Sequence, residues 1–315
     1  MKPISFPLLA LLIVVFADAA PAQAPCSDPD CTASMPAADA CRIYVDSGNG
    51  AGRYTATVIR GRIVNYVRAQ PDGCYDPSRR YGLQGWRLTM RDDHKIRRIA
   101  VLQGPGSLSF ALQDNDGGDY MDGFVWLVPL PRGTVIHDTS ARECTGNCTL
   151  TLDPKDPDDI IVLVGFDVTR VSGDGHVKRF SVGPAVGTAT NPAMQLNFSD
   201  DDFAYRARVQ YAYLPAGALG ARGDVQGSFA RAGDEDEIVR APGPSPNLRA
   251  ATPRGNTVLQ SFVLTFRNGG HFLEDVGIER RDGGYEAWFQ DGQSDDDRRY
   301  PDDPFAWRTR FVILN

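Results

Sequence analysis

Short segments of the chain alternate between apolar and polar residues, and glycine, proline or acidic turns separate these segments. In the segment 83–91, one face carries the apolar side chains of Trp86, Leu88 and Met90, while the residues between them are polar. A period of two is typical of an antiparallel strand with one buried face. No long segment shows the 3.6-residue period of an amphipathic helix. The pattern therefore predicts an all-β fold of short antiparallel strands, as in a sandwich or barrel.

The same order of features occurs three times along the chain. Each copy begins with a strand in which a leucine is followed, two positions later, by a small residue and then an aromatic one, in 83–86, 163–166 and 259–262. Next come a polar turn with a histidine, two alternating strands, an acidic turn and a last strand that opens with aromatic residues. Internal repeats of this kind indicate one structural unit that is used several times.

The repeat predicts three tandem antiparallel β-sandwich modules of about six strands each, over residues 51–133, 134–217 and 218–315. A cysteine-bearing N-terminal segment, 23–50, precedes them, and the acidic and proline-rich stretch 233–255 is expected to be a long exposed loop in the third module. Less regular strands are expected at similar distances upstream of the leucine-containing strands, at 54–59, 134–136 and 224–229.

The first residues have the features of a secretory signal peptide. The basic residue Lys2 is followed by an apolar stretch that ends at Phe16 and by small residues around Ala19 and Ala22. This stretch is shorter than the roughly 20 residues that a spanning helix needs, and no later segment reaches that length. We therefore expect residues 1–22 to be removed on export and the mature protein to be secreted or periplasmic, with no membrane span.

All six cysteines follow the predicted signal peptide, and an even number of cysteines in an exported chain favours disulfides. The residues before the first cysteine do not match a lipoprotein site. A zinc site built from the first four cysteines is the alternative, although their spacing matches no standard zinc motif. A short turn and sequence proximity suggest three pairs: Cys144–Cys148, Cys26–Cys31 and Cys41–Cys74.

The formal net charge of −7 argues against nucleic acid as a partner, because phosphate binding needs a clustered positive face. Arginine carries nearly all of the basic charge, as is typical of GC-rich bacterial genes, so a bacterial envelope is the expected environment. A glycan or a cell-envelope surface is the expected partner.

The common catalytic and nucleotide-binding motifs do not occur in the sequence, so the protein is predicted not to be an enzyme. Ser140, His137 and Asp138 would supply a nucleophile, a base and an acid, but neighbouring residues in a strand point to opposite faces. A hydrolase is therefore only the third choice of function.

Three histidines occupy one position of the repeat: His94, His176 and His271. Imidazole suits a metal or ligand site, and three equivalent histidines around a threefold axis would suit one zinc ion. The alternative is a turn residue whose ring bonds the backbone.

The acidic turns are the predicted calcium sites, because carboxylates that are closely spaced in a turn supply the oxygen ligands that calcium prefers. The alternative is a solvated turn, in which aspartate, asparagine and glycine are favoured by backbone chemistry alone. No other cofactor is expected. The predicted ligands are Asp114, Asp116, Asp119, Asp200, Asp202, Asp291, Asp295 and Asp297.

An aromatic residue follows each acidic turn: Trp126, Tyr205 and Trp307. Buried, these residues would belong to the core; exposed, they would stack on a sugar ring. A six-stranded module with an aromatic last strand resembles the H-type (discoidin/agglutinin-like) lectin domain. The resemblance implies threefold assembly, so three tandem copies would pack as a pseudo-trimer within one chain.

Together these features predict a secreted binding protein that recognises carbohydrate or an envelope surface, with possible help from calcium. The alternative is a structural or assembly protein of the bacterial envelope.

Overall fold

The structure is a computed structural model. The chain divides into two compact units, Met1–Met35 and Pro36–Asn315, and every described residue belongs to the second unit. The structure describes residues 41–46, 53–59, 62–64, 67–70, 74–76, 78–90, 96–104, 107–114, 121–173, 177–188, 190–199, 204–229, 239–244, 257–266, 272–281, 284–292 and 305–314. The predicted signal peptide lies outside them.

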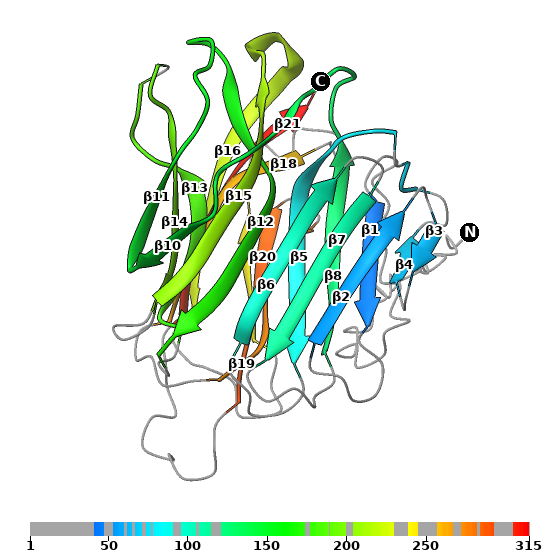
Figure 1. The fold of residues 1–315 in the computed structure, drawn as a ribbon, viewed down its shortest axis with the longest axis vertical. Helices are drawn as coiled ribbons and strands as arrows, with labels where there is room; N and C mark the ends of the chain where they lie inside the picture. The colour runs from blue at the N-terminus through cyan, green and yellow to red at the C-terminus, as the bar shows by residue number, and fades with distance from the viewer. Residues whose placement is uncertain are drawn as a thin grey trace, which may run out of the picture. The chain divides into compact units, whose positions relative to one another are not determined.

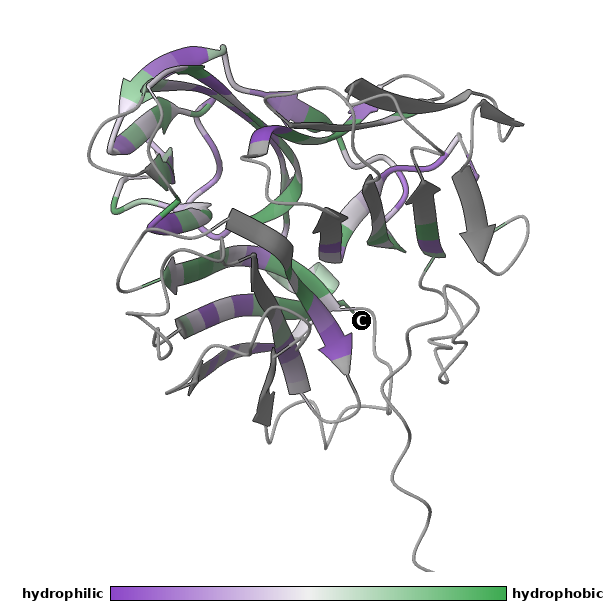
Figure 2. Cartoon of the chain, turned by 90° about the horizontal axis from the view of Figure 1, so that it is seen from below, coloured by the Kyte–Doolittle hydropathy of each residue, from purple (hydrophilic) through white to green (hydrophobic). Residues whose placement is uncertain are grey.

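The prediction of an all-β antiparallel fold is confirmed (Figure 1). The described residues form three sheets, and the only helix among them is the 3-10 turn Ala216–Ala218. Hydrophilic and hydrophobic residues alternate along several of the described strands in Figure 2, whereas the first half of the strand Ile160–Ser172 is apolar and buried throughout.

Sheet A has the strand order β17 (Val239–Pro244), β20 (Gly284–Gly292), β19 (Phe272–Arg281), β5 (Tyr81–Met90), β8 (Met121–Pro129), β1 (Cys41–Asp46) and β4 (Val67–Gln70). Sheet B has the order β10 (Arg142–Thr145), β15 (Ala204–Leu214), β12 (Ile160–Ser172), β6 (Ile96–Gly104), β7 (Ser107–Asp114), β2 (Arg53–Ile59) and β3 (Arg62–Val64), and β9 (Ile136–Asp138) also pairs with β15. Sheet C has the order β11 (Asn147–Thr151), β14 (Ala193–Ser199), β13 (Arg179–Pro184), β18 (Thr257–Phe266), β21 (Phe305–Leu314) and β16 (Leu219–Phe229).

Each of the three sheets combines strands from two different runs of the chain. We call the runs β5–β8, β12–β15 and β18–β21 copies 1, 2 and 3. The second strand of each copy pairs with the first strand of the next: β6 with β12, β13 with β18, and β19 with β5. Figure 1 shows β12 of copy 2 beside β6 of copy 1. Each predicted module therefore supplies strands to two sheets, while the module boundaries stay predictions.

Two outer strands complete the pattern of each copy. One pairs with the last strand of its copy, as β1 does with β8 and β16 with β21, and the other pairs with the third strand, as β2 does with β7. The expected match between 54–59 and 224–229 is therefore wrong, because these segments belong to β2 and β16. The two segments lie at similar distances from the strands that follow them, but one pairs with a third strand and the other with a last strand.

The stretch 233–255, expected to be one long loop, contains the edge strand β17. The prolines of β17, Pro242 and Pro244, lie two residues apart, and both positions pair with β20. Alternate residues of a strand direct their backbone nitrogens to the same side, and an edge strand tolerates proline where that side has no partner. Proline therefore does not exclude a strand here.

The aromatic residue of the repeated motif explains the centre of the core. Trp86, Phe166 and Phe262 come from the first strand of each copy, and their ring centroids lie 5.7, 5.3 and 5.6 Å apart in the three pairs. All three side chains are completely buried. The motif thus marks the position where the three copies meet, and aromatic contacts of this kind add to the energy of apolar burial.

The small residue before each aromatic residue lies at a β-bulge. The register shifts at the same point in each copy, between Leu83 and Gly85 in copy 1 and between Leu163 and Gly165 in copy 2. A Cβ atom on Gly165 would stand 2.1 Å from the carbonyl oxygen of Val101 in the neighbouring copy. The motif therefore requires a small residue because the backbone of the next copy lies against it.

Glutamine amides bond to backbone carbonyl oxygens of the three first strands, and of these glutamines Gln84 and Gln103 are buried while Gln260 is partly buried. Gln84 donates to Thr257 (3.3 Å) and Gln260 to Ile161 (3.0 Å), whereas Gln103 donates to Tyr81 (2.7 Å) and to Val164 (3.4 Å). Gln84 and Gln260 are the bulged residues of their copies, whereas copy 2 has a valine there. A glutamine on β6 makes the equivalent bond, so the same kind of hydrogen bond is made at all three positions.

Two of the three predicted disulfides are present. Cys41 is bonded to Cys74, and Cys144 is bonded to Cys148, while the third predicted pair lies outside the described residues. Zinc binds cysteine as a free thiolate. The alternative zinc site is therefore excluded at Cys41 and Cys74, because both are in a disulfide.

Candidate functional site

The repeat histidines and most of the acidic turns lie outside the described residues. This holds for His94, His176, His271, Asp116, Asp119, Asp200, Asp202, Asp295 and Asp297. Asp114 ends β7 and Asp291 lies near the end of β20, but their side chains are also outside the description. Within the described part of the chain, no group of three residues could hold a metal ion. The calcium and histidine sites stay predictions.

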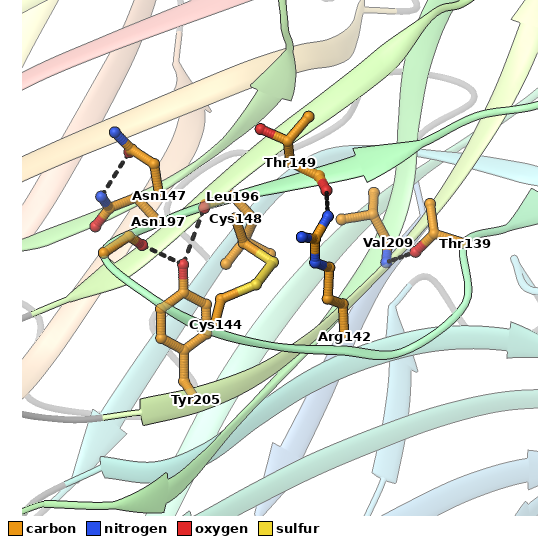
Figure 3. Close-up of a disulfide and its surroundings, with 11 residues drawn as sticks. Thr139, Arg142, Cys144, Asn147, Cys148, Thr149, Leu196, Asn197, Tyr205 and Val209 are labelled. Atoms are coloured by element: carbon orange, nitrogen blue, oxygen red, sulfur yellow. Dashed lines mark hydrogen bonds between the residues drawn. A yellow bond between two sulfur atoms is a disulfide. The ribbon is translucent and has the colours of Figure 1, made fainter.

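The three aromatic residues predicted to lie near the acidic turns are buried. Trp126, Tyr205 and Trp307 expose 3, 0 and 2 % of their surface. The Tyr205 hydroxyl is shared between the carbonyl oxygens of Gly146 and Leu196, next to the Cys144–Cys148 disulfide (Figure 3). Burial raises the pKa of Tyr205 to about 12. Tyr205 therefore pins the junction between sheets B and C and offers no free ring face to a sugar.

Ladder pairing also changes which residues of the last strands are equivalent. Trp126 lies opposite Gly85, and the corresponding partners in copies 2 and 3 are Gln210 and Arg310. Tyr205 and Trp307 therefore do not match Trp126. A binding role for these aromatic residues would require them to be uncovered, so we do not base the site on them.

One position departs from the repeat in a way that suggests function. Opposite the last strand of each copy, Cys41 lies against Leu127 in copy 1, and Gly223 lies against Phe311 in copy 3. Both positions are apolar, with a disulfide in the first and the Phe311 ring over the glycine in the second. The equivalent residue in copy 2 is a histidine, His137. Sites where a sequence breaks its own structural rule are often functional.

His137 lies in a cluster of aromatic rings on β9 and β15. Its ring stacks on Tyr211, with centroids 5.2 Å apart and an angle of 18° between the planes. Tyr213 lies 5.3 Å from both His137 and Tyr211, at steeper angles. Because Tyr211 and Tyr213 are two residues apart on β15, they lie on one face of the strand.

Asp153 completes the cluster and is held by three hydrogen bonds. Its backbone N–H donates to the Tyr211 hydroxyl at 2.9 Å, and the Tyr213 hydroxyl donates to its carbonyl oxygen. Its carboxylate accepts a hydrogen bond from Nδ1 of His137 at 2.9 Å. An ionised carboxylate can only accept, so the proton of this bond lies on Nδ1, and Nε2 is an acceptor when the ring is neutral. The four residues thus form one fixed arrangement, which we call the His137 cluster.

The His137 cluster is open to solvent on part of its surface. The side chains of His137 and Asp153 expose 26 and 66 % of their area. Tyr213 is partly exposed, whereas Tyr211 is buried beneath the histidine. An incoming ligand can therefore reach an imidazole, a carboxylate and one tyrosine ring.

The two tyrosines of the cluster have raised pKa values, chiefly because they are buried. Burial raises the pKa of Tyr213 above the ordinary tyrosine range, and the neighbouring Tyr211, Asp153 and Asp159 raise it further. Burial raises the pKa of Tyr211 and the carboxylate of Asp153 raises it further, whereas hydrogen bonds with the Asp153 backbone and with Tyr213 lower it. Both phenols therefore keep their protons at neutral pH.

Nearby cations are engaged elsewhere. Arg208 donates to the carboxylate of Asp138 at 2.7 Å. Lys155 donates to the carbonyl oxygens of Asp156, Pro157 and Asp159 at 2.8, 3.0 and 2.7 Å. The Ser140–His137–Asp138 set does not form, since Asp138 pairs with Arg208 and His137 with Asp153. The sequence hid this site because Asp153 and the two tyrosines are distant from His137 along the chain.

Among the described residues, no helix is long and apolar enough to cross a bilayer. No protein-family model and no characterised protein matches this chain.

Proposed function

We propose that this chain is an exported carbohydrate-binding protein whose binding site is the His137 cluster. The supporting observation is the fixed, solvent-open arrangement of His137, Tyr213 and Asp153, in a position that is apolar in the other two copies. A sugar offers an apolar ring face and a rim of hydroxyls. An aromatic ring suits the first, and a small number of fixed polar groups suits the second.

Preorganisation supports this proposal over a purely structural role for the exposed atoms. Asp153 and His137 are already oriented by hydrogen bonds, so a ligand does not have to order them on binding. The two tyrosine hydroxyls hold the backbone of Asp153 in place through hydrogen bonds to its N–H and its carbonyl oxygen. Neither bond requires an exposed carboxylate or an imidazole at the surface, and it is these groups that a sugar would use.

The resemblance to H-type lectin modules points to the same class of ligand. Calcium in the acidic turns belongs to the proposal as an aid to binding. A structural protein of the envelope is the competing function, in which the His137 cluster serves only to fix the connection between sheets B and C.

A glycan array probed with the oxidised protein, followed by calorimetry on the best ligand, tests the proposal. We expect Tyr213→Ala and His137→Ala to weaken binding about tenfold, since ring stacking and a hydrogen bond each contribute on the order of 1 kcal/mol. Arg310→Ala is the matched control, because Arg310 is an exposed strand residue of copy 3 outside the cluster. If no glycan binds, or if the control weakens binding as much as the cluster variants do, the structural function is favoured.

A further inference from the structure

We infer that the ligand of the His137 cluster carries a protonated amine, and that it is a polysaccharide of deacetylated amino sugars. This inference rests on the proposed function and specifies its ligand.

The exposed charge of the cluster is negative. Asp153 exposes 66 % of its side chain, the Tyr211 side chain interacts with its carboxylate, and among the described residues its one ion-pair partner is Nδ1 of His137. That contact uses one oxygen, so the other is accessible to a cation. An ammonium group is a compact donor with three hydrogens and no acceptor, which matches a carboxylate.

No neighbouring cation neutralises this carboxylate by direct contact in the described part of the chain. Arg208 is committed to Asp138, which follows His137 on β9 and therefore points to the other face of the strand. Lys155 is surrounded by three carbonyl oxygens in its own loop. A ligand amine would thus supply the missing positive charge.

The rings favour the same group. A cation within about 6 Å of a tyrosine ring centroid is attracted by the electrons of the ring face. Tyr213 is partly exposed and its hydroxyl donates to the Asp153 carbonyl oxygen, so its ring lies close to this carboxylate, and Asp153 and Asp159 add to the burial that raises its pKa. An amine between Asp153 and Tyr213 would meet both, while a neighbouring sugar hydroxyl would donate to Nε2 of His137.

These features also distinguish an amino sugar from chemically similar sugars. An N-acetylated sugar has the same ring and hydroxyls but no charge, so it would lose the contact with Asp153. An acidic sugar would be repelled by that carboxylate. The cluster is therefore expected to rank amino sugars first, N-acetylated sugars second and uronic acids last.

Calorimetry with the full oxidised chain tests this ranking, using a glucosamine oligomer and its fully N-acetylated counterpart at a pH where the amine is protonated. We expect the glucosamine oligomer to bind about tenfold more tightly at low salt and the difference to shrink at high salt, because salt screens exposed charges. Asp153→Asn should remove the difference while leaving the N-acetylated oligomer bound. Asp138→Asn is the matched control. It removes the same charge from the residue that follows His137, and it should keep the preference for the glucosamine oligomer.

Equal binding of the two oligomers by the unmodified protein would overturn the inference and leave the proposed function standing. Binding of other sugars on an array, with neither oligomer bound, would have the same meaning. An array on which no sugar binds would overturn the proposed function itself.

Discussion

Gly183 of β13 lies so close to Ser261 of β18 that a Cβ atom on the glycine would stand 2.3 Å from the serine Cβ. Ser261 is the small residue of the repeated motif in copy 3, where copies 1 and 2 have glycine. Because Ser261 carries a side chain at this position, the residue that faces it on β13, Gly183, has none. The space between the two strands is fixed, and only one of the two positions can carry a side chain.

We therefore expect Gly183→Ala to lower the free energy of unfolding by about 1–3 kcal/mol, as overpacking of a close contact does. Adding Ser261→Gly should restore most of the loss, because it removes the atom that the alanine meets. Urea denaturation of the two variants measures this. Gly217→Ala is the control, since its Cβ would have no atom within 4 Å. Equal losses in the single and double variants would contradict the explanation.

Removing the disulfides should destabilise the protein unequally. Loop-closure entropy predicts a loss of about 4 kcal/mol for Cys41–Cys74 and about 2 kcal/mol for Cys144–Cys148, since the two bonds span 33 and 4 residues. Denaturation of the two double-serine variants gives the order. The reverse order would mean that Cys144–Cys148 contributes chiefly through the junction of sheets B and C in the native state.

Alkaline pH should unfold the protein through its buried tyrosines. Burial raises the pKa of Tyr285 to about 12, and the pKa of an unfolded tyrosine is about 10. The unfolded chain thus releases this proton first, so the stabilisation is complete below about pH 10 and is lost as the pH rises toward 12. Phenolate absorbance followed together with circular dichroism should show these tyrosines ionising as the sheets unfold.

Tyr285→Phe provides the control for this titration. The variant loses the 3.2 Å hydrogen bond to Thr257, which lowers stability at neutral pH, but it has no proton to release. Its stability should therefore change less between pH 10 and 12 than that of the unmodified protein. An identical decline in both proteins would assign the alkaline transition to other groups.

Calcium should raise the melting temperature if the acidic turns bind it, because a ligand of the native state alone stabilises that state by mass action. Thermal unfolding of the oxidised protein with calcium and with a chelator measures this. Magnesium at the same concentration is the control for general charge screening. Equal melting temperatures in calcium and chelator would identify the turns as solvated turns.

Alternation and repetition predicted the strands, the all-β class and the position of the buried aromatic residues. The motif around Trp86 was recognisable because a bulge, a close approach and a buried ring each restrict residue type. Cysteine spacing likewise predicted Cys144–Cys148, since the short segment between these two cysteines can form a tight turn.

Strand exchange between copies could not be predicted in the same way. A period of two identifies the buried face of a strand, but it contains no information on which strand lies beside it. Both β6 and β7 have the alternation required for pairing with β12, and only the structure selects β6. The His137 cluster was hidden for a related reason, because Asp153 and Tyr213 meet His137 through the topology and not through local spacing.

The pairing of β19 with β5 has a consequence for biogenesis. Sheet A remains incomplete until the third copy has been synthesised, so the first copy must wait for almost the last part of the chain. A copy made alone would have two unpaired strand edges, one on its first strand and one on its second strand. Three separate chains of one copy each could satisfy the same pairings.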